Sequence, residues 1–169
     1  LLSMTAMEAP ADLSQRAVRD AKAALLSALR PVRPEDAVRG QYAAGAIGGA
    51  NVPAYRDEPG VPGDSRVETY AALKLNLDTP RWSGVPFYLR SGKRLTAHRT
   101  EIVVQFKATA HPLFREADGT APAPNRLVLQ IDGDKGLRTV FQTKAPGPGL
   151  RLSPVAAVFR HDDAFVDSP

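Results

Sequence analysis

Cysteine is absent from the 169 residues of this chain. Disulfide bridges and thiolate metal sites are therefore excluded, and we expect a reducing, cytoplasmic environment. No hydrophobic run approaches the length of a membrane-spanning helix, and the first ten residues lack the basic start of a secretory signal, so we expect neither a membrane span nor secretion. Hydrophobic residues at 43% and charged residues at 24% are the composition of a globular domain.

Acidic residues are missing from one long window, between Thr79 and Thr100. The window contains the basic residues Arg81, Arg90, Lys93, Arg94 and Arg99, with His98 beside them. The net charge of the chain is only +4, so this concentration is what favours an anionic partner. Basic runs are also common on solvated surfaces, and the spacing alone leaves both interpretations open.

Motifs for nucleotide binding, nucleophilic catalysis and metal binding are also absent. The glycines of residues 43–55, "AAGAIGGANVPAY", lack the spacing of a P-loop or a dinucleotide fingerprint, so we interpret this segment as a loop. No G-x-S-x-G motif occurs. His98, His111 and His161 show no paired ligand spacing, so we predict no metal site.

The N-terminal part of the chain has a helical pattern. Leu1 to Met7 predict a helix that stops before Pro10, and apolar residues recur at helical spacing between residues 12 and 30. Asp12 or Ser14 is the expected N-cap of the second helix, and the proline at position 31 disfavours its continuation. We therefore expect residues 1–32 to be helical.

Residues 33–169 have the alternating pattern of strands separated by turn residues. The candidates are residues 37–42, 66–78, 85–90, 100–108, 125–132, 137–145 and 154–161. We expect Leu127, Leu129 and Ile131 to share one face, residues 111–124 to form a loop, and "GDKG" at residues 133–136 to form a hairpin turn. Helices followed by a run of strands predict an α+β fold with a large antiparallel sheet and helices on one face. One complete helix cannot cover that face, so we expect further chain or a partner subunit to cover the rest.

Lys93 is the candidate ligand-binding residue of the basic window. It follows the strand of residues 85–90, and we expect Ser91 and Gly92 to form the turn. Loops at the ends of strands often carry function, and an ammonium group offers three donors to a phosphate or a sugar hydroxyl. Gly92 would permit close approach of a ligand, and no nearby acid in the sequence competes for the ammonium.

Two other interpretations of the window remain. A basic β-sheet module could bind nucleic acid or another polyanion, with Trp82 and Tyr88 as stacking groups. These aromatic residues do not alternate with the basic residues, so we expect no nucleic-acid partner. The third interpretation is a dimerisation sheet that contacts no ligand.

Residues 55–107, with the core segment "RWSGVPFYLRSGKRL" from Arg81 to Leu95, resemble the C-terminal part of the glucose-6-phosphate dehydrogenase family, as do "RGQY" and "VRDAKAALLSALRPV". The resemblance extends to about Phe159. It implies an enzyme that oxidises glucose 6-phosphate to 6-phospho-D-glucono-1,5-lactone with NADP or NAD, the first step of the oxidative pentose phosphate pathway. It also implies an antiparallel sheet through which subunits form a homodimer or homotetramer.

The resemblance assigns substrate-binding roles by position. Lys93 matches the family's lysine that contacts the sugar phosphate, and His98 occupies the position of a second basic contact; whether His98 or Arg99 makes it stays open. Arg90 matches an arginine that helps to hold a structural NADP in mammalian members. The family's accompanying pattern is not kept between Gln130 and Gly136, so we predict no cofactor-binding residue here.

The family's Rossmann domain and its catalytic His-Asp pair precede the region that this chain resembles. The resemblance therefore implies no catalytic residue within these 169 residues. We expect a domain truncated at both ends that is inactive as a dehydrogenase by itself. Preference for NADP or NAD, and the size of the oligomer, stay open.

Overall fold

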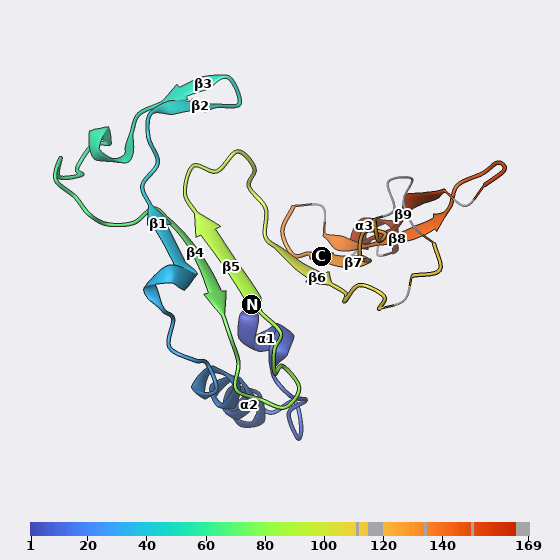
Figure 1. Cartoon of the computed structure of the whole chain (residues 1–169). Helices are drawn as coiled ribbons and strands as arrows, with labels where there is room; N and C mark the ends of the chain where they lie inside the picture. Colours follow the sequence, from blue (N-terminus) through green and yellow to red (C-terminus); the bar gives the residue numbers. More distant parts are fainter. Residues whose placement is uncertain (111, 115–119, 134, 150, 165–169) are drawn as a thin grey trace. The chain divides into compact units, whose positions relative to one another are not determined.

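The computed structural model describes residues 1–110, 112–114, 120–133, 135–149 and 151–164. The chain forms two compact units, Leu1–Thr96 and Ala97–Pro169 (Figure 1). The first unit contains α1 (Leu2–Ala6), α2 (Gln15–Ser27), β1 (Ala37–Gly40), β2 (Gly45–Ile47), β3 (Ala50–Val52), β4 (Tyr70–Leu75) and β5 (Phe87–Gly92). The second contains β6 (Glu101–Gln105), β7 (Arg126–Gln130), β8 (Gly136–Lys144), β9 (Leu152–Arg160) and α3 (His161–Ala164).

All strand pairs among the described residues are antiparallel, which confirms the predicted α+β class. The strands fall into three sheets, with the orders β1-β4-β5, β2-β3 and β6-β7-β8-β9. None of the described helices is both long and apolar enough to cross a membrane.

The sequence predicted the N-cap of helix α2 and its end before the proline at position 31. The Ser14 hydroxyl oxygen accepts a hydrogen bond from the Ala17 amide at 3.2 Å, which confirms Ser14 as the N-cap. The helix stops at Ser27, before the proline at position 31. Beyond the helix, the chain runs beside the residues that follow β4: Leu29 forms an isolated β-bridge with Leu77, and the Arg30 amide donates to the Asn76 carbonyl at 3.0 Å.

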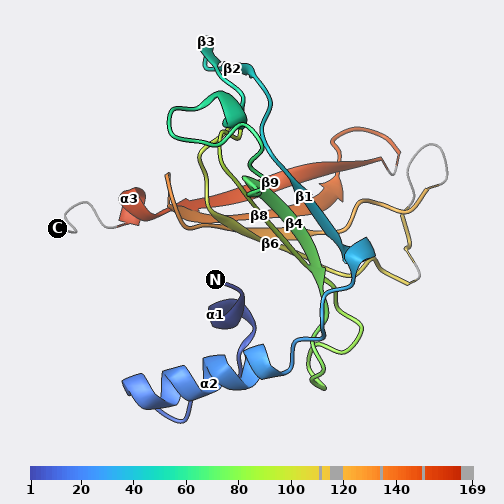
Figure 2. The ribbon, with the colours of Figure 1, turned by 90° about the vertical axis from the view of Figure 1, so that its left-hand side faces the viewer.

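The core of the first unit lies where α1 and α2 meet the end of β4 (Figure 2). Ala6, Leu25 and Leu77 are only 1%, 5% and 3% exposed. Trp82 packs against this cluster, its indole N–H donates to the Ala6 carbonyl at 2.8 Å, and its ring meets Phe87 edge-on at 5.2 Å. Trp82 is therefore held by the core and is not the exposed stacking group that the polyanion hypothesis required.

Strand β4 lies at the centre of the first sheet and is shorter than the predicted strand of residues 66–78. Its register pairs Ala72 with Val38 of β1 on one side and with Arg90 of β5 on the other. Val67 is 62% exposed and precedes the strand. Its carbonyl accepts from the Gln41 side chain at 2.9 Å, a side-chain contact outside the strand ladder.

Residues 43–55 are not the loop that we predicted. They contain the hairpin β2–β3, whose connection is formed by Gly48 and Gly49. Both glycines have left-handed backbone angles, with φ of 58° and 84°. A two-residue turn of this kind matches the twist of paired strands, and glycine adopts it without strain.

The second unit is a four-stranded antiparallel meander. Val128 on β7 is 8% exposed and therefore more buried than the predicted apolar set Leu127, Leu129 and Ile131. Gly136 begins β8 opposite Arg160, and a Cβ atom there would collide with the backbone carbonyl oxygen of Phe159. The close approach of β9 therefore requires glycine at this position.

The hairpin predicted near residues 133–136 is confirmed by the pairing of Gln130 with Gly136. The predicted loop of residues 111–124 lies partly outside the described residues, since position 111 and residues 115–119 are not described.

Apolar side chains on the strands of both units are exposed, among them Val38 at 62%, Val103 at 50% and Val158 at 58%. A contiguous patch of exposed apolar groups is typical of a surface where other protein packs. That a partner subunit covers them stays a prediction.

Candidate functional site

Lys93 is the first residue after β5, which extends through Ser91 and Gly92. The prediction that these two residues turn the chain was wrong, because Gly92 still pairs with Tyr70 in the sheet. The Lys93 amide donates a hydrogen bond to the Thr69 carbonyl at 2.8 Å. The backbone of Lys93 is therefore fixed by the neighbouring chain.

The glycine before Lys93 is explained by packing within the protein. A Cβ atom on Gly92 would lie 2.8 Å from Cδ2 of Tyr70 and 3.3 Å from the Leu95 side chain. Both side chains therefore close over Gly92, which differs from the expected role of admitting a ligand. The chain turns at Arg94, whose φ of 54° is the only positive value of a non-glycine residue in the described part of the chain.

The basic window contains no acidic residue, but the fold places acidic side chains from outside the window beside it. Carboxylates outside the window approach four of its members: Glu8 meets Arg81 at 3.0 Å, Glu58 meets Arg94 at 2.7 Å, Glu101, two residues further along the chain, meets Arg99 at 3.8 Å, and Asp132 meets His98 at 3.5 Å. Among the described residues, no carboxylate pairs with Lys93 or Arg90. In the described part of the chain, Lys93 is therefore a cation without a carboxylate partner, as an anionic ligand would require.

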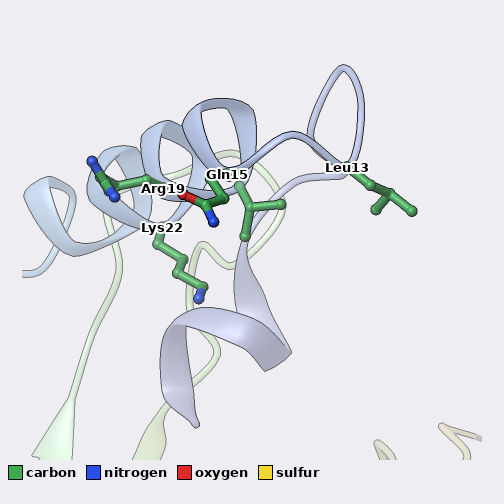
Figure 3. Close-up of a pocket in the computed structure, with 5 residues that line it drawn as sticks. Leu13, Gln15, Arg19 and Lys22 are labelled. Carbon is green, nitrogen blue, oxygen red and sulfur yellow. The ribbon is translucent and has the colours of Figure 1, made fainter.

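Lys93 is exposed and lines neither of two hollows in the described residues. One hollow, of about 410 Å³, lies against the start of α2, where Figure 3 shows its polar and apolar lining residues. The other, of about 380 Å³, is lined by Arg30, Arg33, Asp36, Lys74 and their neighbours. Among the described residues, Lys93 is therefore an exposed cation that lies outside these two hollows.

His98 and Arg99 belong to the second unit, whereas Lys93 belongs to the first. The side chain of His98 is 94% exposed and faces Asp132, and that of Arg99 is 56% exposed and faces Glu101. Their assignment as the second substrate contact stays a prediction.

The sequence analysis did not identify Tyr42, Glu58 and Thr69 as residues of the site around Lys93. The Tyr42 amide donates to the Thr69 hydroxyl at 3.0 Å, and the Tyr42 hydroxyl donates to Oε1 of Glu58 at 3.1 Å. Glu58 accepts a second hydrogen bond from Arg94, which raises the pKa of that guanidinium; the contact with Tyr42 adds to the rise. These residues lie in the segments that carry the family resemblance, but their spacing in the sequence does not predict the contacts.

The described residues contain no group of three or more histidine, aspartate or glutamate side chains that could hold a metal ion. His111 lies outside the described residues.

Comparison with known proteins identifies the family. The sequence model of the family described as "Glucose-6-phosphate dehydrogenase, C-terminal domain" matches residues 1–169. The chain belongs to this family. Its membership agrees with the α+β architecture and with the resemblance carried by the segment from Arg81 to Leu95.

Relatives of this glucose-6-phosphate dehydrogenase domain are similar over nearly all of the chain. The glucose-6-phosphate 1-dehydrogenase of Chlamydia muridarum is 41% identical over 98% of the chain, and that of Aggregatibacter actinomycetemcomitans is 44% identical over 96%. The chain spans 33% of the length of each. A solved glucose-6-phosphate dehydrogenase in complex with its substrate glucose-6-phosphate is 29% identical, with a TM-score of 0.84 over 99% of this chain and 33% of the solved one.

Proposed function

We propose that the chain is the substrate-binding, C-terminal part of a glucose-6-phosphate 1-dehydrogenase. The whole enzyme would oxidise D-glucose 6-phosphate to 6-phospho-D-glucono-1,5-lactone with NADP or NAD. Family membership over residues 1–169 supports this proposal, as does the substrate held by a structurally similar enzyme.

The observation that carries the proposal is the position of Lys93. It follows β5 directly, its backbone is anchored to Thr69, and no carboxylate among the described residues pairs with its side chain. A doubly charged phosphate bound by such an ammonium forms charge-assisted hydrogen bonds. Binding at the phosphate would hold the sugar so that its C1 atom is correctly placed for oxidation.

The residues of this chain contribute to binding and not to the redox step. Among the described residues, no glycine-rich turn leads from a strand into an α-helix, so this part of the protein does not fit a dinucleotide cradle. When bound to the whole enzyme, NADP or NAD supplies the acceptor for the hydride that leaves C1. Lys93 takes no part in that transfer and acts at the phosphate.

The proposal is tested by assaying the whole enzyme with glucose 6-phosphate and with glucose, following reduction of NADP and of NAD. We expect a strong preference for the phosphorylated sugar, because only that substrate offers an anion to Lys93. Equal use of the two sugars, or no reduction with either coenzyme, would contradict the proposal.

The second contact is tested with His98→Ala and Arg99→Ala in the whole enzyme. We expect His98→Ala to raise KM for glucose 6-phosphate by roughly 2- to 10-fold, the range of a contact weaker than that of Lys93. Arg99→Ala is the matched comparison, since Arg99 already faces Glu101. A larger effect of Arg99→Ala would transfer the role to Arg99.

A further inference from the structure

The turn after Lys93 has an unusual backbone conformation for the residue it uses. Arg94 is left-handed, with a φ of 54°, a region in which a side chain with a Cβ atom is strained and glycine is favoured. Such a conformation persists where its surroundings enforce it, and it is concentrated at functional sites. The question is therefore what holds Arg94 in place.

Glu58 and Tyr42 hold the Arg94 side chain. Nη2 of Arg94 and the hydroxyl of Tyr42 donate to the same oxygen, Oε1 of Glu58, at 2.7 and 3.1 Å. The guanidinium also lies 6.0 Å from the centre of the Tyr42 ring, within the range of a cation–π contact. The Glu58 side chain is only 21% exposed, so this ion pair is more sheltered than most pairs on the surface.

Glu58 and Tyr42 are themselves anchored. The Tyr55 amide donates to the Tyr42 carbonyl at 3.1 Å, and the two tyrosine rings meet edge-on at 5.8 Å. The Tyr42 amide donates to the hydroxyl of Thr69, whose carbonyl accepts from the Lys93 amide. Hydrogen bonds therefore connect both sides of Lys93 to the same segment, through Thr69 before the turn and through Arg94 after it.

We propose that Glu58, Arg94 and Tyr42 form a positioning clamp for Lys93. This inference rests on the proposed function, in which Lys93 binds the substrate phosphate. The clamp does not touch the substrate; it keeps the left-handed turn in place, and the turn sets the direction in which the Lys93 side chain leaves the backbone. Glu58, Arg94 and Tyr42 are positioning residues, and the anion-binding group is Lys93.

The test uses the whole enzyme and the ratio of kcat/KM for glucose 6-phosphate to kcat/KM for glucose. Glu58→Gln removes the charge that holds Arg94 while keeping the size of the side chain. We expect this variant to lower the ratio on the order of 3- to 10-fold through KM for the phosphorylated sugar, because misplacing a binding group weakens its contact. Glu8→Gln, which breaks the Arg81 pair elsewhere in the same unit, is the control and should leave the ratio unchanged.

Arg94→Gly provides an independent variant, because glycine adopts the left-handed angle without strain and the guanidinium is lost. It should lower the ratio as Glu58→Gln does. If Glu58→Gln fails to fold, this variant decides whether the clamp positions Lys93. In a Lys93→Ala background, Glu58→Gln should change the ratio no further.

Two results would overturn the clamp while leaving the proposed function intact. One is an equal loss of activity with both sugars, which a general structural defect would cause. The other is a fall in the ratio that persists when Lys93 is alanine. If Lys93→Ala alone leaves the ratio unchanged, the assignment of Lys93 itself fails, and the clamp fails with it.

Discussion

Replacing Lys93 by alanine in the whole enzyme is expected to lower kcat/KM for glucose 6-phosphate by roughly 10- to 150-fold. A hydrogen bond to a charged group contributes about 1.5–3 kcal/mol, which converts to that range of rates. Among the described residues, no carboxylate pairs with Lys93. The variant therefore loses a contact with the substrate and breaks no ion pair within the described part of the protein. Activity with glucose should change little, because glucose offers no anion to the ammonium.

Steady-state kinetics with both sugars is the measurement for Lys93→Ala. Lys107→Ala is the matched control, since it removes an exposed lysine from the other unit of the chain. Lys93→Arg should retain part of the affinity, because it keeps the charge but changes the geometry of the donors. Unchanged kinetics of Lys93→Ala, or an equal loss with glucose, would show that Lys93 does not bind the phosphate.

The isolated chain of 169 residues is expected to reduce neither NADP nor NAD in the presence of glucose 6-phosphate. Its described residues do not fit a dinucleotide, and the region that it matches in its family is a C-terminal domain. Without a bound hydride acceptor, the sugar phosphate cannot be oxidised however well it is held. The measurement is absorbance of the reduced coenzyme at high protein concentration.

The whole enzyme at the same molar concentration is the positive control for that assay. The chain should be purified from a host that lacks a glucose-6-phosphate dehydrogenase of its own, so that contamination cannot supply the activity. Turnover that copurifies with the chain would mean that it contains a complete catalytic site, contrary to the function we propose.

Structural elements that depend on residues close together along the chain were predictable from the sequence. Ser14 caps α2 because its side chain reaches an amide three residues ahead, a contact that the local sequence contains. The alternation of apolar and polar residues, which is also a local signal, predicted strands close to β4, β5 and β8. The hairpin β2–β3 was not predicted, although two adjacent glycines are also typical of a two-residue turn, the role that Gly48 and Gly49 have in the structure.

The site was predicted only in part. Lys93 was identified from its place after a strand and from the family resemblance, whereas its neighbours Glu58 and Tyr42 were not identified at all. Glu58 lies 36 residues before Arg94, and Glu8 lies 73 residues before Arg81. No periodic pattern in a sequence records which distant segments meet, so these ion pairs could not be derived from it.

By itself, the sequence determined the order of helices and strands, the antiparallel α+β class and the family, because helical spacing, alternation, turn residues and a specific motif are all local signals. Only the tertiary structure decided which basic residues of one acid-free window pair with a carboxylate and which have no such partner among the described residues. The physical reason is that Coulomb attraction and hydrogen bonding act between groups that are close in space, and the fold brings together carboxylates and guanidinium groups that are far apart along the chain, such as Glu8 with Arg81 and Glu58 with Arg94.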